Sequence, residues 1–141
     1  MKRVIYCFAK DKSTLFYELE RESKPLVKHL VKYFMYPGHT SASHWGDEIY
    51  SFLNSVSKLK KKNRRPTSEQ ILKSTWNVYE DSIIEYIPTV ADDYGDSDVD
   101  PKVVYNNCRH YMIWLSGMLS DVGSVSRKAC KCELERIEMR C

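Results

Sequence analysis

The most constraining feature of the sequence is the segment Pro101 to Val122, whose apolar residues cover nearly every face of one predicted helix. Asp100 followed by proline is a typical helix start, because the first helical turn does not need the missing proline N–H. A helix that is apolar on most sides is stable in water only when other helices cover it. The segment therefore predicts an all-α fold, a helical bundle around a near-apolar central helix. The residues at helical spacing in it are Val104, Cys108, Tyr111, Leu115, Met118 and Val122, with Met112, Ile113 and Trp114 adding to them.

Apolar residues recur at helical spacing along most of the remaining chain, and no strand alternation or internal repeat accompanies them. Pro37-Gly38 and Asn63 to Pro66 are typical of helix ends, whereas Thr67 to Gln70 reads as a capping box. The short apolar start, Arg3 to Phe8, fits a strand or an extended arm. The predicted helices span Lys24 to Tyr36, about Ser43 to Lys61, Thr67 to Pro88, and about Ser126 to Arg140, and an exposed loop is predicted from Thr89 to Asp100.

The length of the chain predicts a single helical domain over residues 1–141, since 141 residues can bury a core without disulfides or a metal. The N-terminal apolar run ends at Lys10, which is too short for the core of a signal peptide. No segment reaches the roughly 18 apolar residues that indicate a membrane span. We therefore expect a soluble cytoplasmic protein with no membrane span.

Charge is distributed unevenly along the chain. Lys58 to Arg65 holds six basic residues and no acid, whereas Glu80 to Asp100 holds eight acids and no base. A phosphate backbone is bound by a continuous basic face, and a basic run followed by an acidic run does not form one. The pattern argues against nucleic acid as a partner.

The cysteines and histidines do not match the spacing of a metal site. Cys130-x-Cys132 and Cys108-x-His110 have one intervening residue, which is not the usual spacing of zinc ligands. Cys130 also recurs with Leu134 and Ile137 at helical spacing, as a small apolar core residue does. We expect no metal and no cofactor. Five cysteines leave a homodimer open, linked by a disulfide in an oxidised preparation.

No sequence motif for catalysis is present. The chain has no nucleophile elbow, phosphate loop, dinucleotide fingerprint or paired-histidine metal motif. His29, His39, His44 and His110 are scattered, and none has a carboxylate partner that the sequence can show. We expect a protein that is not an enzyme, although residues far apart in sequence can still assemble a site in space. A common role for grooves between amphipathic helices is to hold another amphipathic helix.

The stretch Ser41 to Val56, "SASHWGDEIYSFLNSV", places glycine and two acids directly after its first large apolar residue. One explanation is a helix start, where Asp47 and Glu48 complement the positive end of the helix dipole and Gly46 is tolerated.

A second explanation is a family motif. Trp45-Gly46-Asp47-x-Ile49 resembles the third homology motif of the Bcl-2 family, in which Gly-Asp lies between two large apolar residues on the second helix. The amphipathic segment "PLVKHLVKYFMYPGH" before it is similar to the first helix of that family. "STWNVYEDSIIEYI" resembles the fifth helix, and "RHYMIWLSGMLSD" resembles the sixth through Trp114, Leu119 and Asp121.

Several positions depart from the family pattern. Ala42 stands where a larger apolar residue is expected, and Val78 replaces the arginine that pairs with an aspartate of the bound helix. Arg64 or Arg65 would have to replace that arginine. A clear second homology motif after Gly123 and a hydrophobic tail anchor are both missing, as in the compact, divergent members that viruses encode.

The resemblance implies a Bcl-2-like inhibitor of apoptosis. Such a protein sequesters the amphipathic death-motif helix of a pro-apoptotic relative in a hydrophobic groove, in the host cytoplasm if the source is viral. The groove residues that it implies are Ile49, Phe52, Val56, Arg64, Arg65, Leu72, Trp76, Tyr79 and Ile83. Core packing is the alternative role for each apolar member, and Trp76 is the strongest anchor because a large ring buries the most area.

Two alternatives remain. His29-Leu30-x-Lys32, Pro37, Trp45 and Ile49 are also similar to a bacterial all-helical domain family of unknown function. That resemblance implies no activity. A separate functional hypothesis is a bacterial or phage immunity or inhibitor protein whose acidic segment, Glu80 to Asp100, covers a basic toxin. Charge would then steer association and make it sensitive to salt.

Overall fold

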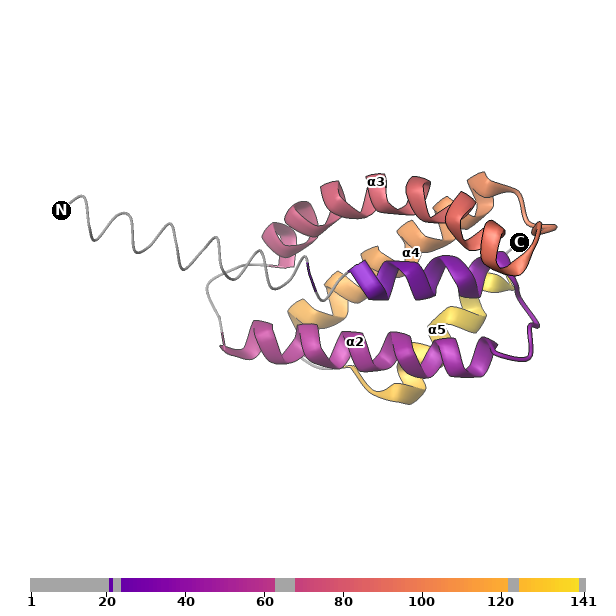
Figure 1. Cartoon of the computed structure of the whole chain (residues 1–141). Helices are drawn as coiled ribbons and strands as arrows, with labels where there is room; N and C mark the ends of the chain where they lie inside the picture. The colour runs from indigo at the N-terminus through magenta and orange to yellow at the C-terminus, as the bar shows by residue number, and fades with distance from the viewer. Residues whose placement is uncertain (1–20, 22–23, 63–67, 122–124, 140–141) are drawn as a thin grey trace.

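The structure, a computed structural model, describes residues 21, 24–62, 68–121 and 125–139. Within these ranges every regular element is an α-helix, which confirms the predicted all-α bundle (Figure 1). The predicted strand or arm at Arg3 to Phe8 lies outside the described residues. The first described helix covers residues 24–35 and is called the N-terminal helical segment below. It is followed by α2 (Ala42–Lys62), α3 (Ser68–Tyr94), α4 (Pro101–Asp121) and α5 (Arg127–Glu138).

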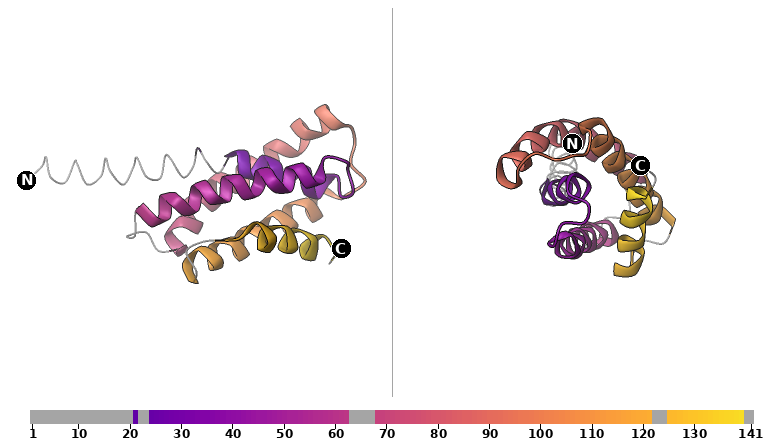
Figure 2. Two further views of the ribbon diagram at one scale, coloured as in Figure 1. Left: turned by 90° about the horizontal axis from the view of Figure 1, so that it is seen from below. Right: turned by 90° about the vertical axis from the view of Figure 1, so that its right-hand side faces the viewer.

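The N-terminal helical segment lies inside the bundle. The end-on view in Figure 2 shows it between α2 on one side and the pair α3 and α4 on the other. At 100° per residue its buried positions cover roughly 200° of the helix circumference. The segment therefore packs against neighbours on two flanks. Its buried residues are Leu26, Val27, Leu30, Val31, Tyr33, Phe34 and Met35.

Helix α4 contributes a second apolar surface to the core. It contacts both α3 and α5, and its inner side buries Val104, Cys108, Tyr111, Met112 and Leu115. Its outer side is exposed, since Arg109 and His110 face water and Ile113 keeps 49% of its surface accessible. The predicted central helix thus shares the centre of the bundle with the N-terminal helical segment.

Several predicted helix ends are confirmed by their capping contacts. Gly38, with φ of +84°, follows the N-terminal helical segment in a conformation that suits glycine. At the start of α4, the Oδ1 atom of Asp100 accepts a hydrogen bond of 2.8 Å from the backbone N–H of Lys102. Ser126 caps α5, because its Oγ accepts from the N–H of Ala129 at 3.1 Å. Short polar side chains at these positions replace missing backbone partners.

The prediction that the third helix ends at Pro88 is wrong. Helix α3 continues through Pro88 to Tyr94, so the exposed loop is limited to residues 95–100. Proline removes the hydrogen bond to the carbonyl of Ile84, but Val90 beyond it is fully buried, and packing outweighs the lost bond. The helix ends at Gly95, whose φ is +91° and whose N–H donates to the carbonyl of Ala91 at 2.8 Å.

The α3–α4 loop is attached to the end of the N-terminal helical segment. The hydroxyl of Tyr36 donates to the carbonyl of Gly95, and the hydroxyl of Ser97 donates to the carbonyl of Met35. Aromatic rings close the same end of the bundle: the ring of Trp45 stacks on His39 with centroids 4.9 Å apart and meets Tyr94 edge to face at 5.5 Å. These contacts fix the loop relative to the start of α2.

Replacing Pro88 with alanine should stabilise the protein. Alanine supplies the N–H that the carbonyl of Ile84 lacks, while the unfolded chain gains some freedom, so we expect a net gain of about 1–2 kcal/mol. Gly95→Ala is the matched control with the opposite sign, since a side chain at positive φ costs about 1 kcal/mol. Urea unfolding followed by circular dichroism measures both, and a destabilised Pro88→Ala variant would contradict the account of α3.

Candidate functional site

An apolar depression lies between α3 and α4. It has a volume of about 510 Å³ and is lined by Ile84, Ile87, Pro101, Lys102, Tyr105 and Asn106. These residues define the α3–α4 groove. The loop of residues 95–100 joins α3 and α4, so the two helices run antiparallel beside each other (Figure 1). The groove follows the seam between them on the outside of the bundle.

Two hydrogen bonds hold the walls of the groove. The hydroxyl of Tyr105 donates to Oε1 of Glu80 across the seam at 2.8 Å, which sets the axial position of α4 against α3. Burial and the neighbouring Glu80 carboxylate raise the pKa of the Tyr105 hydroxyl, so it stays a donor. At the loop end, the Asp100 cap fixes the first turn of α4, where Pro101 and Lys102 lie. The residues that line the groove are therefore held in place by the backbone of helices α3 and α4.

Two large apolar side chains are exposed on the outer side of α3 and α4, one of them in the groove. Ile84 keeps 62% of its surface accessible on α3, and Ile113 keeps 49% on the outer side of α4. Ile83, the neighbour of Ile84, is fully buried, because successive helical residues point in directions 100° apart. Exposed apolar patches of this kind mark sites of interaction with other proteins.

The two walls carry opposite charges. Exposed Glu80, Asp81 and Glu85 lie on α3, whereas exposed Lys102 and Arg109 lie on α4. A ligand in the groove would meet carboxylates along one side and cations along the other. This arrangement favours a ligand that has an apolar centre and charged flanks.

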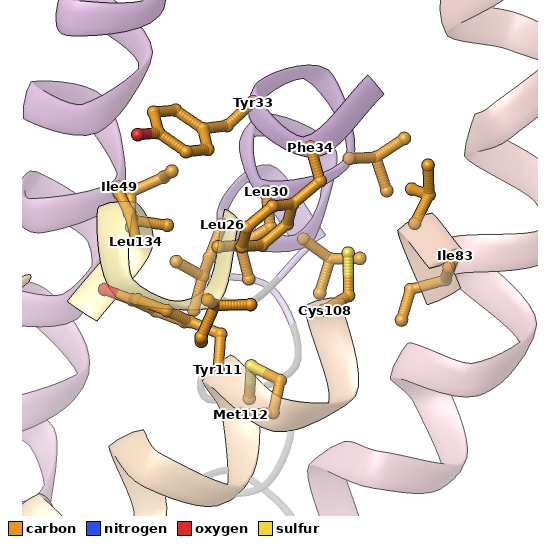
Figure 3. Packing of buried hydrophobic residues seen from close by; sticks show 14 of the residues in the cluster. Leu26, Leu30, Tyr33, Phe34, Ile49, Ile83, Cys108, Tyr111, Met112 and Leu134 are labelled. Carbon is orange, nitrogen blue, oxygen red and sulfur yellow. The ribbon is translucent and has the colours of Figure 1, made fainter. Parts of the chain in front are cut away.

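The structure does not bring Ile49 and Ile83, two of the predicted groove residues, to one open surface. Both are fully buried in the core. Figure 3 shows Ile49 on the α2 side and Ile83 on the α3 side, with Leu30 and Phe34 of the N-terminal helical segment between them. Phe52 is half-buried and its ring lies 5.5 Å from that of His29. The N-terminal helical segment occupies the space where the resemblance implies a groove.

The other predicted groove residues lie outside the described part of the structure. Arg64 and Arg65 fall in the gap at residues 63–67. Val56, Leu72, Trp76 and Tyr79 lie on described stretches of helix backbone, but their side chains are outside the described residues. Their assignment to a binding groove stays a prediction. Sequence reasoning missed Ile84, Ile87 and Tyr105, and the adjacent pair Ile83-Ile84 was the available signal, since only one of the two can face the core.

The Gly46-Asp47-Glu48 stretch has a packing role in the fold. Helix α2 begins at Ala42 and has no acid in its first turn, so the helix-start explanation for these acids is wrong. Gly46 instead faces α5, where a Cβ atom would lie 3.7 Å from Cε of Lys131 and 3.9 Å from Cδ1 of Leu134. The Oδ1 atom of Asp47 lies 2.9 Å from Nζ of Lys131 and 3.9 Å from Nε of Arg127. Glycine and aspartate thus join α2 to α5.

A smaller cavity of about 250 Å³ lies beside this contact. It is lined by Tyr33, Ala42, Ser43, Gly46, Lys131, Leu134 and Glu135. Its polar groups already have partners: the Tyr33 hydroxyl donates to Glu138 at 3.2 Å, and Lys131 holds Asp47. Burial raises the pKa of the Tyr33 hydroxyl further. The cavity lies between the N-terminal helical segment, α2 and α5, and it offers little apolar surface to a ligand.

The cysteine and histidine pairs of the sequence do not form a site. Cys108 is fully buried whereas His110 is exposed, and Cys130 is buried whereas Cys132 is exposed. Burial raises the pKa of the Cys130 thiol to about 11, which makes it a poor nucleophile and metal ligand near neutral pH. Within the described ranges, no group of three or more His, Cys, Asp or Glu residues could hold a metal ion.

The acidic segment forms one end of the bundle. Asp92 and Asp93 lie in the last turns of α3, Asp96 and Asp98 lie in the loop, and all four are exposed. Lys58, at the start of the basic run, is exposed near the opposite end of α2 (Figure 1).

Comparison with protein-family models, with curated proteins and with solved structures gave no match to this chain. The resemblance to the Bcl-2 family therefore depends on the sequence motifs alone. None of the described helices is long and apolar enough to cross a membrane. The geometry of the described surface carries the functional argument from here.

Gly46 should tolerate alanine and reject leucine. A Cβ atom fits at ordinary van der Waals distance, and alanine favours a helix by up to about 1 kcal/mol over glycine, so Gly46→Ala should match or exceed wild-type stability. Gly46→Leu must separate α2 from α5 and should destabilise the fold by about 1–3 kcal/mol. Thermal and urea unfolding measure both. Equal stability of the two variants would exclude a close contact at this position.

The Asp47 ion pair should contribute a pH-dependent part of the stability. The hydrogen bond from Lys131 lowers the pKa of Asp47, and Arg127 adds to the effect. Because the pKa of Asp47 is lower in the folded state than in the unfolded state, the ion pair stabilises the fold fully above the ordinary aspartate pKa of about 3.9. This stabilisation is lost as the pH falls through the lower pKa of the folded state. The difference in unfolding free energy between wild type and Asp47→Asn should therefore shrink on acidification. In a Lys131→Met background the difference should be small at every pH.

Proposed function

We propose that this protein is a binding protein that holds an amphipathic helix of a partner protein in the α3–α4 groove. The observation that carries the proposal is the exposure of Ile84, 62% accessible beside an apolar depression of about 510 Å³. A side chain of this size on rigid helix backbone costs solubility unless a partner covers it.

The shape of the groove supports a helix as the occupant. Two helices packed 8–10 Å apart leave a trough along their seam that matches the ridge of a third helix, roughly 10–12 Å across. The wall of the groove on α4 is formed by Pro101 to Asn106, and the exposed side of α4 continues beyond it to Ile113, about 16 Å or three helical turns from Lys102. A ligand helix with apolar residues at positions i, i+3 or i+4, and i+7 would contact this wall throughout.

The sequence resemblance suggests the identity of the partner. If the protein acts as the Bcl-2 family does, the ligand is the death-promoting helix of a pro-apoptotic relative, and its capture inhibits apoptosis. Such a helix has an apolar stripe with charged flanks, as the groove favours. Lys102 and Arg109 on α4 then provide cations for an acidic residue of the ligand, a role that the resemblance alone gave to Arg64 or Arg65.

The acidic end of the bundle supports a second candidate function. Asp92, Asp93, Asp96 and Asp98 are exposed together, and a basic toxin surface would be attracted to them. Such an immunity or inhibitor protein binds through charge and is weakened by salt, because mobile ions screen exposed charges within about 10 Å at 0.1 M. Binding through an apolar groove depends much less on salt.

Ile84→Glu should weaken helix binding at least tenfold without unfolding the protein. The substitution places a charge in the apolar groove, while the site is exposed enough for the fold to accept it. Calorimetric titration with synthetic peptides of about 26 residues, each carrying a pro-apoptotic homology helix, measures the change. Asn54→Glu is the matched control, since it adds the same charge to an exposed position on α2.

Three results distinguish the candidates. Submicromolar peptide binding that survives 0.5 M salt and is lost in Ile84→Glu supports the groove and identifies the death signal that it captures. Tight binding with equal loss in Asn54→Glu would contradict this location of the site. No binding to any peptide would remove the apoptotic proposal. The immunity hypothesis requires salt-sensitive binding to a basic protein that disappears when Asp92, Asp93, Asp96 and Asp98 are changed to Asn.

A further inference from the structure

The charged and apolar residues on the outer side of α3 and α4 form a self-complementary pattern. Exposed Asp81 lies on α3, and exposed Lys102 and Arg109 lie on α4. Each helix also carries one exposed isoleucine, Ile84 on α3 and Ile113 on α4. Acids and bases are thus segregated onto two adjacent, antiparallel helices. A surface of this kind can pair with a second copy of itself when a twofold axis exchanges the two helices.

The required axis runs parallel to the helices. Rotation by 180° about it places α3 of one copy over α4 of the other, and it leaves the level of every residue along the axis unchanged. Each helix then meets an antiparallel helix across the interface as well as beside it. The contact is isologous, so each favourable pair occurs twice.

The axial levels of the charges match in this arrangement. The hydrogen bond of 2.8 Å between Tyr105 and Glu80 shows that these two residues lie near one level. Asp81 follows Glu80, whereas Lys102 and Arg109 lie three residues before and four residues after Tyr105. At 1.5 Å per residue, Asp81 of one copy lies between the levels of Lys102 and Arg109 of the other. Both long side chains can reach that level.

The apolar residues lie on either side of the charges along the same surface. Ile84 is four residues beyond Glu80 and Ile113 is eight residues beyond Tyr105, so their levels along the axis are about 18 Å apart. Ile84 leans toward α4, in the groove that it shares with Tyr105, and Ile113 continues the exposed apolar surface along α4. When two copies associate in this way, each copy covers Ile84 and Ile113 of the other. The outer surface of the two helices measures roughly 30 Å by 20 Å, so each copy buries roughly 600 Å². That area is at the small end for specific interfaces and predicts a weak, concentration-dependent dimer.

We infer that the outer side of α3 and α4 is a homodimer interface, in which Asp81 of each copy meets Lys102 and Arg109 of the other, and Ile84 and Ile113 are covered on either side of these charges. The dimer occludes the α3–α4 groove. Its regulatory meaning rests on the proposed function: a partner helix and a second copy compete for one surface, so the free protein protects its apolar groove until a ligand displaces the second copy.

Sedimentation velocity of the reduced full chain, from about 5 to 200 µM, tests the interface, and the reducing agent removes any disulfide-linked species. We expect a monomer at the lowest concentration and a dimer at the highest. Lys102→Glu and Asp81→Lys should each raise the dissociation constant at least tenfold, because each places like charges opposite one another. The triple variant Asp81→Lys with Lys102→Glu and Arg109→Glu reverses every sign of the contact and should restore dimerisation to within about threefold of wild type.

The controls separate this inference from the proposed function. Asn54→Glu on α2 should dimerise as wild type does, and Ile84→Glu should stay monomeric. A chain that is monomeric at 200 µM, or a triple variant that stays as weak as the single variants, would overturn the interface even if peptides bind at 1 µM. Conversely, charge-swap rescue without peptide binding supports the interface and rejects the proposed ligand. Where peptides do bind, adding one must lower the dimer fraction, since persistence of the dimer would refute a shared surface.

Discussion

Burial of the N-terminal helical segment on two flanks is the constraint on which the rest of the bundle depends. Leu26, Leu30 and Phe34 lie between α2 and the α3–α4 pair, so neither of these layers can form its inner surface without them. Because apolar burial contributes roughly 25 cal/mol per Å², this one helix supplies a large part of the driving force for all its neighbours. Helices α2 and α3 are held in place mainly by the segment between them.

The sequence predicted the helices well and their relative positions poorly. Capping signals at Asp100 and Ser126 are local, so they could be read from neighbouring residues, and both helix starts agree with the structure. Pro88 does not end α3, because its local penalty is smaller than the stabilisation from burying Val90 in the core. Local sequence patterns therefore predict the starts of these helices more reliably than their ends.

The candidate site shows the same limit more clearly. The Bcl-2 resemblance placed Ile49 and Ile83 in one groove, but the helix that separates them comes from a different part of the chain, and no spacing rule reveals that. The α3–α4 groove exists because two helices meet at a certain angle and level, fixed by contacts such as Tyr105 with Glu80. Gly46 and Asp47 are similar: their spacing suggested a motif, and only the position of α5 shows what they contact.

The location of the core helix near the start of the chain affects how the protein is made. The N-terminal helical segment leaves the ribosome before α3, α4 and α5, which cover it. At roughly 5–20 residues per second, its apolar flanks wait several seconds for their partners. The Tyr36–Gly95 and Met35–Ser97 contacts also join residues about sixty positions apart. During synthesis the nascent chain therefore presents the apolar flanks of this helix uncovered, as a substrate for chaperones that bind exposed helical surfaces.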